Sequence, residues 1–120
     1  MNRLHVLAEI LSTSTRLIAN PVSLAEKEER VGEICLALES VIRARGQRYV
    51  MMNVRRDDLP GVEAVLPSLS GPTVMEVAAS ENLVAVHAVV GEERIYSLIN
   101  QLKRAGARDI LVMPIERMVR

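Results

Sequence analysis

Aromatic residues are almost absent from this chain of 120 residues, which contains no Phe, no Trp and only two Tyr, Tyr49 and Tyr96. Proteins that bind single-stranded nucleic acid stack the bases on aromatic side chains, so this composition argues against that class. The charge balance agrees, because 15 basic and 15 acidic residues give a formal net charge of zero. A polyanion would find no net electrostatic attraction, and we therefore expect no nucleic-acid partner.

Cysteine and long apolar runs are equally scarce. The lone Cys35 cannot form a disulfide within the chain, which agrees with a reducing compartment. No apolar stretch approaches the roughly 20 residues that cross a bilayer. Residues 1–10 also lack the continuous apolar segment of a signal peptide. The sequence therefore predicts a cytoplasmic protein without a membrane partner.

Motifs for metal binding and catalysis are missing as well. His5, Cys35 and His87 are too widely scattered to form a metal site. The six glycines are dispersed along the chain, which argues against a loop that cradles phosphate. Asp57 and Asp58 are adjacent and precede a helical pattern, so helix capping is favoured over acid–base chemistry. We predict no catalytic and no metal-binding residue.

The region from Gln47 to Arg120 shows a regular succession of strand and helix patterns. Strands are predicted at 49–54, 73–78, 83–90 and 109–115, and helices at 59–66 and 91–106. The order β-α-β-β-α-β predicts an α+β, ferredoxin-like sandwich, with a four-stranded antiparallel sheet and both helices on one face. The other face stays open, and we expect another subunit, a domain or a ligand to cover it. For His87, a position on that exposed or interface face is favoured over a ligand or pH-sensitive role.

Residues 1–46 are expected to precede this domain as a separate segment, with the boundary at Gln47. Alternating apolar positions predict two short strands within 4–19, although 4–11 also fits a helical period. Ser23 and Glu26 have the spacing of a capping box, which would begin one long helix ending near Ala44.

Several segments resemble, in order, one known family. STRLIANP at 14–21, LESV at 38–41 and RARG at 43–46 resemble the end of the catalytic region of ATP phosphoribosyltransferase, the first enzyme of histidine biosynthesis. Its long-form regulatory domain is similar to YVMMNV at 49–54, LPSLSGPTV at 66–74, AVHAVV at 85–90, GARDILV at 106–112 and PIERM at 114–118. The resemblance covers essentially the whole chain.

The resemblance implies a regulatory domain that binds L-histidine, the end product of the pathway, where domains of neighbouring subunits meet. Matching positions imply the histidine-binding residues Leu69, Thr73, Ala88, Val89, Asp109 and Asn53. Asp109 would pair with the ammonium or imidazolium of the ligand, and the hydroxyl of Thr73 or nearby backbone groups would hold its carboxylate. The implied protein partner is a second copy, giving a homo-oligomer, or a catalytic chain. The family enzyme uses magnesium, but no cofactor is expected on this chain.

Three interpretations stay open. The first is a histidine-binding regulatory module. The second is a C-terminal fragment of the transferase itself, of which residues 1–46 would be the tail of the catalytic domain. The third is an oligomerisation module that no longer binds histidine. The sequence contains no counterpart of the family's loop for phosphoribosyl pyrophosphate, so we expect this chain alone to lack transferase activity.

Overall fold

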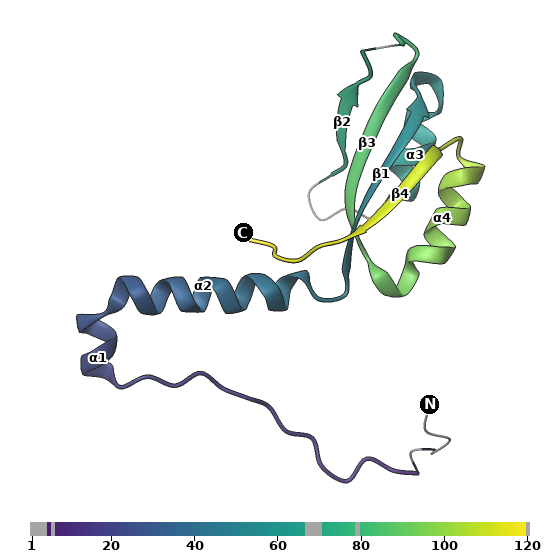
Figure 1. Ribbon diagram of the computed structural model, residues 1–120. Coiled ribbons are helices and arrows are strands. Elements are labelled where there is room, and N and C mark those ends of the chain that lie inside the picture. Colours follow the sequence, from purple (N-terminus) through teal and green to yellow (C-terminus); the bar gives the residue numbers. More distant parts are fainter. Residues whose placement is uncertain (1–4, 6, 67–70, 79, 120) are drawn as a thin grey trace. The chain divides into compact units, whose positions relative to one another are not determined.

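The computed structural model describes residues 5, 7–66, 71–78 and 80–119 (Figure 1). They belong to two compact units, the first ending at Glu33 and the second beginning at Ile34. None of the described helices is both long and apolar enough to cross a membrane. The domain boundary predicted at Gln47 stays a prediction.

The beginning of the first unit contains no regular secondary structure in its described part. His5 and residues 7–20 lie outside helices and strands, so the prediction of two strands within 4–19 is wrong for these residues. Apolar residues do alternate there, but a strand also needs a partner to complete its hydrogen-bond ladder. No described strand pairs with this segment, and the side chains of Leu7 and Ile10 are exposed.

Helix α1 (Pro21–Glu26) follows, and α2 (Glu28–Ala44) comes after it. Asn20 caps α1, because its Oδ1 accepts a hydrogen bond of 2.9 Å from the backbone amide of Val22, and Pro21 supplies the fixed φ that suits the first helical position. The capping box predicted at Ser23 is therefore wrong. The predicted single helix is also wrong, since Lys27 leaves helical geometry with φ −125° and ψ 29°.

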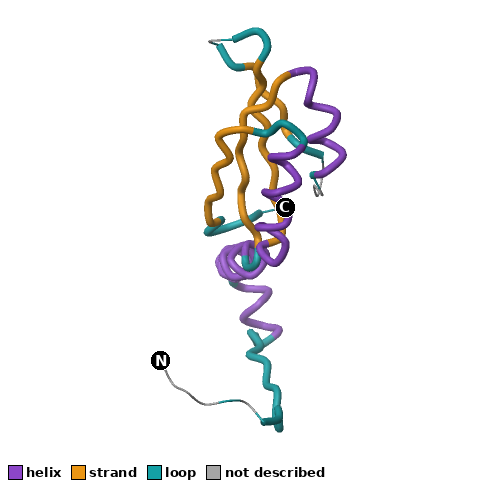
Figure 2. The backbone as a smooth tube through the Cα atoms, turned by 90° about the vertical axis from the view of Figure 1, so that its right-hand side faces the viewer, coloured by secondary structure: helices purple, strands orange, loops and turns teal. Residues whose placement is uncertain are grey.

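The second unit contains the predicted sandwich. Its strands are β1 (Gln47–Arg55), β2 (Thr73–Glu76), β3 (Leu83–Gly91) and β4 (Arg108–Pro114). They form one sheet in the order β2-β3-β1-β4, and every neighbouring pair is antiparallel. Helices α3 (Leu59–Val65) and α4 (Ile95–Arg104) lie on one side of it (Figures 1 and 2). This arrangement confirms the ferredoxin-like fold.

The core lies between the sheet and these two helices. Alternate residues of the central strands are buried there, and α3 and α4 complete the cluster with Val62, Leu98 and Leu102. The buried strand residues are Val50, Met52, Val54, Val84, Val86, Ala88 and Val90. Each large apolar side chain contributes about 1.5–3 kcal/mol by leaving water. Because burial alternates along β1 and β3, the residues between these positions project from the opposite side of the sheet.

Each of the two helices is entered through a short 3₁₀ turn, Arg56–Asp58 before α3 and Glu92–Arg94 before α4. Asp58 lies at the N-cap position of α3 but makes no capping bond with its side chain. The prediction that an aspartate caps this helix through its carboxylate is therefore wrong at Asp58. The turn holds Asp58 at φ −89° and ψ −11°, whereas a capping residue normally has extended backbone angles.

Candidate functional site

The side of the sheet opposite α3 and α4 is the candidate binding surface, which we call the open face. Register places its side chains in rows across the strands, since Met51 lies opposite His87 on β3 and Leu111 on β4, and Thr73 on β2 lies opposite His87. The open face comprises Thr73, Met75, Ala85, His87, Val89, Tyr49, Met51, Asn53, Leu111 and Met113.

The open face exposes large apolar side chains at both edges of the sheet. Met75 on β2 is 53% exposed, and Leu111 on β4 is 52% exposed. The favoured position for His87 is confirmed, because it lies half-buried among these residues. Exposed apolar surface on one side of a sheet often marks a site of interaction.

Two of the predicted site residues meet at the end of the sheet where β1 and β4 pair. Asn53 lies on β1, and its Nδ2 donates a hydrogen bond of 3.1 Å to Oδ2 of Asp109 on β4. Among the described residues no basic group lies within ion-pair distance of Asp109. The exposed carboxylate therefore retains lone pairs with which it can accept from a cationic ligand.

A β-bulge places Asp109 where Asn53 can reach it. Met51 pairs with Leu111, whereas Asn53 pairs with Arg108, so β4 carries an extra residue across this step. Asp109 adopts φ 51°, in the left-handed region, which Asp tolerates better than most residues. The bulge interrupts the ladder and re-aims the side chain, as bulges beside binding sites often do.

Three other predicted residues lie on β2 and at the point where β3 extends beyond it. Thr73 is exposed and begins β2. Val89 lies on the open face of β3, two residues beyond the partner of Thr73. Ala88 is only 6% exposed and belongs to the core, so its side chain is not available to a ligand. Among the described strands, β3 has β1 as its only neighbour from Ala88 onward, which leaves backbone groups on the β2 side for recognition.

The structure thus separates the predicted residues into two clusters. The strands β2 and β4 lie at opposite edges of the four-stranded sheet, three strand spacings apart. At the usual spacing of neighbouring strands, this separation amounts to about 14 Å. Asp109 and Thr73 consequently cannot both contact one small ligand within a single chain. Leu69 lies outside the described residues.

Sequence reasoning missed one polar pair on the open face. The hydroxyl of Tyr49 and Nδ1 of His87 form a hydrogen bond, and the two rings meet edge-on with centroids 5.6 Å apart. The Nε2 atom of His87 is buried and has no partner among the described residues. The sequence shows a tyrosine and a histidine in two separate predicted strands, but it does not show that they meet. Only the pairing register of β1 with β3 brings them together.

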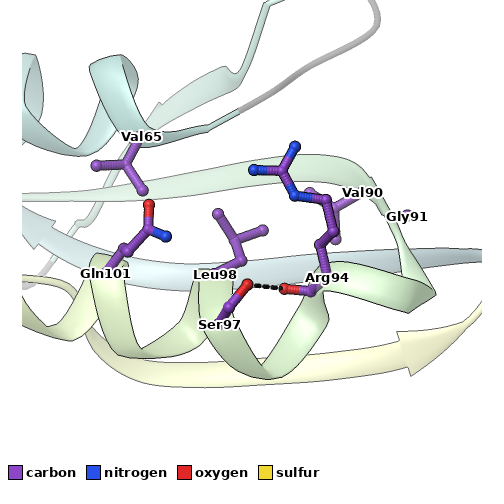
Figure 3. Close-up of a pocket in the computed structure, with 7 residues that line it drawn as sticks. All are labelled: Val65, Val90, Gly91, Arg94, Ser97, Leu98 and Gln101. Carbon is purple, nitrogen blue, oxygen red and sulfur yellow. Dashed lines mark hydrogen bonds between the residues drawn. The ribbon is translucent and has the colours of Figure 1, made fainter.

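A small cavity on the helix side of the sheet is a poorer candidate. It has a volume of about 40 Å³ and lies between α3, α4 and the end of β3, lined by Val65, Val90, Gly91, Arg94, Ser97, Leu98 and Gln101 (Figure 3). Ser97 Oγ donates to the backbone carbonyl of Arg94 at 3.0 Å. Pockets for small molecules usually have about 300–1,000 Å³, and none of the predicted site residues lines this one.

The resemblance implies magnesium for the family enzyme, but the described residues do not form a fitting site for it. Within residues 5, 7–66, 71–78 and 80–119, no group of three or more His, Cys, Asp or Glu side chains is placed to hold a metal ion. Asp109 and Asn53 supply too few oxygen donors for a hard cation, which takes about six.

Comparisons with known proteins identify clear relatives of this chain. A family model described as HisG, C-terminal domain, matches residues 44–117. The ATP phosphoribosyltransferase of Methanocella arvoryzae is 56% identical over 120 residues, which are 100% of this chain and 42% of that protein. Those of Methanothermobacter thermautotrophicus and Methanocaldococcus jannaschii are 49% and 46% identical, over 99% of this chain and 42% of each relative. The chain therefore spans about two fifths of the length of these curated relatives.

Proposed function

Because the chain belongs to the family of the HisG C-terminal domain, we propose that it is the L-histidine-binding regulatory part of an ATP phosphoribosyltransferase. In this role it exerts feedback control on histidine biosynthesis in the cytoplasm. The chain itself carries no transferase activity, and the catalytic residues lie on other parts of the same protein or on a partner chain.

The observation that carries the proposal is the Asn53–Asp109 pair. The amide of Asn53 fixes the carboxylate of Asp109 by a 3.1 Å hydrogen bond at an exposed bulge. A fixed carboxylate without a basic partner among the described residues suits the ammonium or the imidazolium of histidine. Because the carboxylate is already held in place before binding, less conformational entropy is lost when the complex forms.

The separation of the two clusters favours a site shared between copies. One copy would supply Asn53 and Asp109, and its neighbour would supply the hydroxyl of Thr73 and the backbone near Val89. The exposed Leu111 and Met75 flank these clusters at the two edges and would be buried in such a homo-oligomer. Histidine binding would then strengthen association of the copies. A ligand that binds only where two copies meet shifts the equilibrium toward the associated state.

Isothermal titration calorimetry with L-histidine tests the proposal on this chain. We expect saturable binding that weakens by about 10- to 100-fold in Asp109→Asn, because a charge-assisted hydrogen bond is lost. Thr73→Val should weaken it by about 2- to 10-fold. Asp57→Asn is the matched control, since Asp57 is an exposed aspartate in the 3₁₀ turn before α3 and should leave the affinity unchanged.

Sedimentation velocity on the same samples separates the competing interpretations. Binding together with ligand-promoted association supports a shared regulatory site. If the chain forms an oligomer but its titration with millimolar histidine gives no heat, the chain is an assembly module that does not bind histidine. The exposed apolar residues of the open face favour this alternative. Binding that is equally strong in Asp109→Asn and Thr73→Val would refute the assignment of the site while leaving histidine recognition in place.

A further inference from the structure

The C-terminal tail returns to the second half of α2 and bonds to it. After β4 the chain runs toward this part of the helix (Figure 1), and the amide of Met118 donates a 2.9 Å hydrogen bond to the carbonyl of Ser40. Ser40 and Ala44, one helical turn apart, are each 3% exposed, whereas Ile42 between them is 63% exposed. The buried side of this helical segment is therefore the side of Ser40, whose carbonyl receives the tail.

The contact requires close approach of two backbones. A carbonyl oxygen has two lone pairs, so Ser40 can accept from Met118 in addition to an amide of its own helix. The small side chains of Ser40 and Ala44 leave room for the tail. The hydroxyl of Ser40 is itself satisfied, because it donates to the carbonyl of Ala37 at 2.8 Å.

Two further contacts fix the sheet side of the junction between α2 and β1. The connection consists of Arg45 and Gly46, and Gly46 has φ 68°, which glycine adopts without strain. The carbonyl of Gly46 accepts a 2.8 Å hydrogen bond from the amide of Glu92. The carboxylate of Glu92 also pairs with the guanidinium of Arg48, the residue that lies opposite Pro114 on β4.

We propose that residues 115–119, which we call the C-terminal strap, fix the second half of α2 to the sheet. Neither of the two contacts on the sheet side of the junction involves a residue of α2, so without the strap the helix could swing about the connection at Arg45 and Gly46. With it, residues 34–44 and β4 move as one body, and any displacement of β4 is passed to the helix. The proposal does not depend on histidine binding.

Amide hydrogen exchange on the whole chain tests the strap, with Met118→Pro as the first variant because proline lacks the donor. We expect amides 41–45 to exchange about fivefold faster than in the unmodified chain. The reason is that the hydrogen bond from Met118, which opposes local opening of this segment, is lost. Met118→Ala keeps the donor and should exchange like the unmodified chain. The central amides of β1 and β3 report whether the sheet is intact.

A chain ending at Glu116 is the second variant, because proline also restricts the residue before it. This truncation lacks the donor without introducing a new constraint, and residues 117–119 lie outside the sheet. It should raise exchange at 41–45 by a similar factor. The proposal is overturned if the truncated chain keeps the exchange rates of 41–45, or if Met118→Ala accelerates them as much as Met118→Pro does.

Discussion

Replacing Gly106 by alanine should destabilise the domain more than any other glycine-to-alanine change in it. Gly106 follows α4 with φ 102°, a region that residues with a Cβ rarely adopt. A Cβ placed there would lie 2.6 Å from Oδ2, 2.8 Å from Cγ and 2.9 Å from Cβ of Asp58. Because the contact extends to the Cβ of Asp58, a rotation of the carboxylate cannot relieve it.

The magnitude follows from two separate effects. A residue with a Cβ at positive φ costs about 1–2 kcal/mol. Forcing additional atoms into an occupied space costs about 1–3 kcal/mol. The free energy of unfolding of Gly106→Ala should therefore fall by about 2–5 kcal/mol, which is a large share of the stability of a small domain.

Urea unfolding followed by circular dichroism measures this change through the transition midpoint at constant slope. Gly61→Ala is the matched control, since Gly61 lies in α3 and a Cβ there meets nothing within 4 Å. The same substitution should stabilise the protein at that position by about 0.4–1 kcal/mol.

A double-mutant cycle with Asp58→Gly separates the collision from the backbone strain. Removing the side chain of Asp58 should recover about 1–3 kcal/mol in the Gly106→Ala background, beyond its own effect measured alone. The reasoning is refuted if Gly106→Ala lies within about 0.5 kcal/mol of the unmodified protein, which is the scatter of ordinary surface changes. If the cycle shows no coupling energy, only the contact with Asp58 is refuted, and the argument from backbone strain at Gly106 still stands.

Substitutions at three further places in the domain test other features by the same unfolding assay. The exposed ion pair joins Arg56 to Glu76, and Arg56 also bonds a backbone carbonyl of the β2–β3 loop. Arg56→Ala should therefore lower the free energy of unfolding by about 1–2 kcal/mol, and Glu76→Gln by less than about 1 kcal/mol; equal losses would contradict this. Tyr49 makes the only hydrogen bond from the described residues to the ring of His87. Tyr49→Phe should cost about 0.5–1.5 kcal/mol, and an unchanged midpoint would argue against that bond. Asp109 lies at positive φ, where a β-branched residue is strained. Asp109→Val should cost about 1–2 kcal/mol, whereas Asp109→Asn should stay within about 0.5 kcal/mol, so a similar loss in both would exclude backbone strain as the cause.

The order of the elements in the second unit was predictable because local patterns and the global fold agree there. β3 is nearly continuous in apolar residues, and it proves to be a central strand between β1 and β2. Residues 7–19 also carry a strand-like pattern, but they have no partner strand among the described residues. Periodicity indicates which face of a strand would be buried. Whether the strand forms at all depends on hydrogen bonds from elsewhere in the chain or from another chain.

The site was less predictable, because it depends on register rather than on pattern. Alternation alone assigns Ala88 to the same face as Val86 and Val90, so its exclusion from the open face could have been foreseen. The Asn53–Asp109 bond could not, since it needs both the pairing of β1 with β4 and the bulge within it. A slip of one residue turns every side chain of a strand to the other face. The extra residue at the bulge performs such a slip locally, and it is the reason that the carboxylate of Asp109 lies beside Asn53.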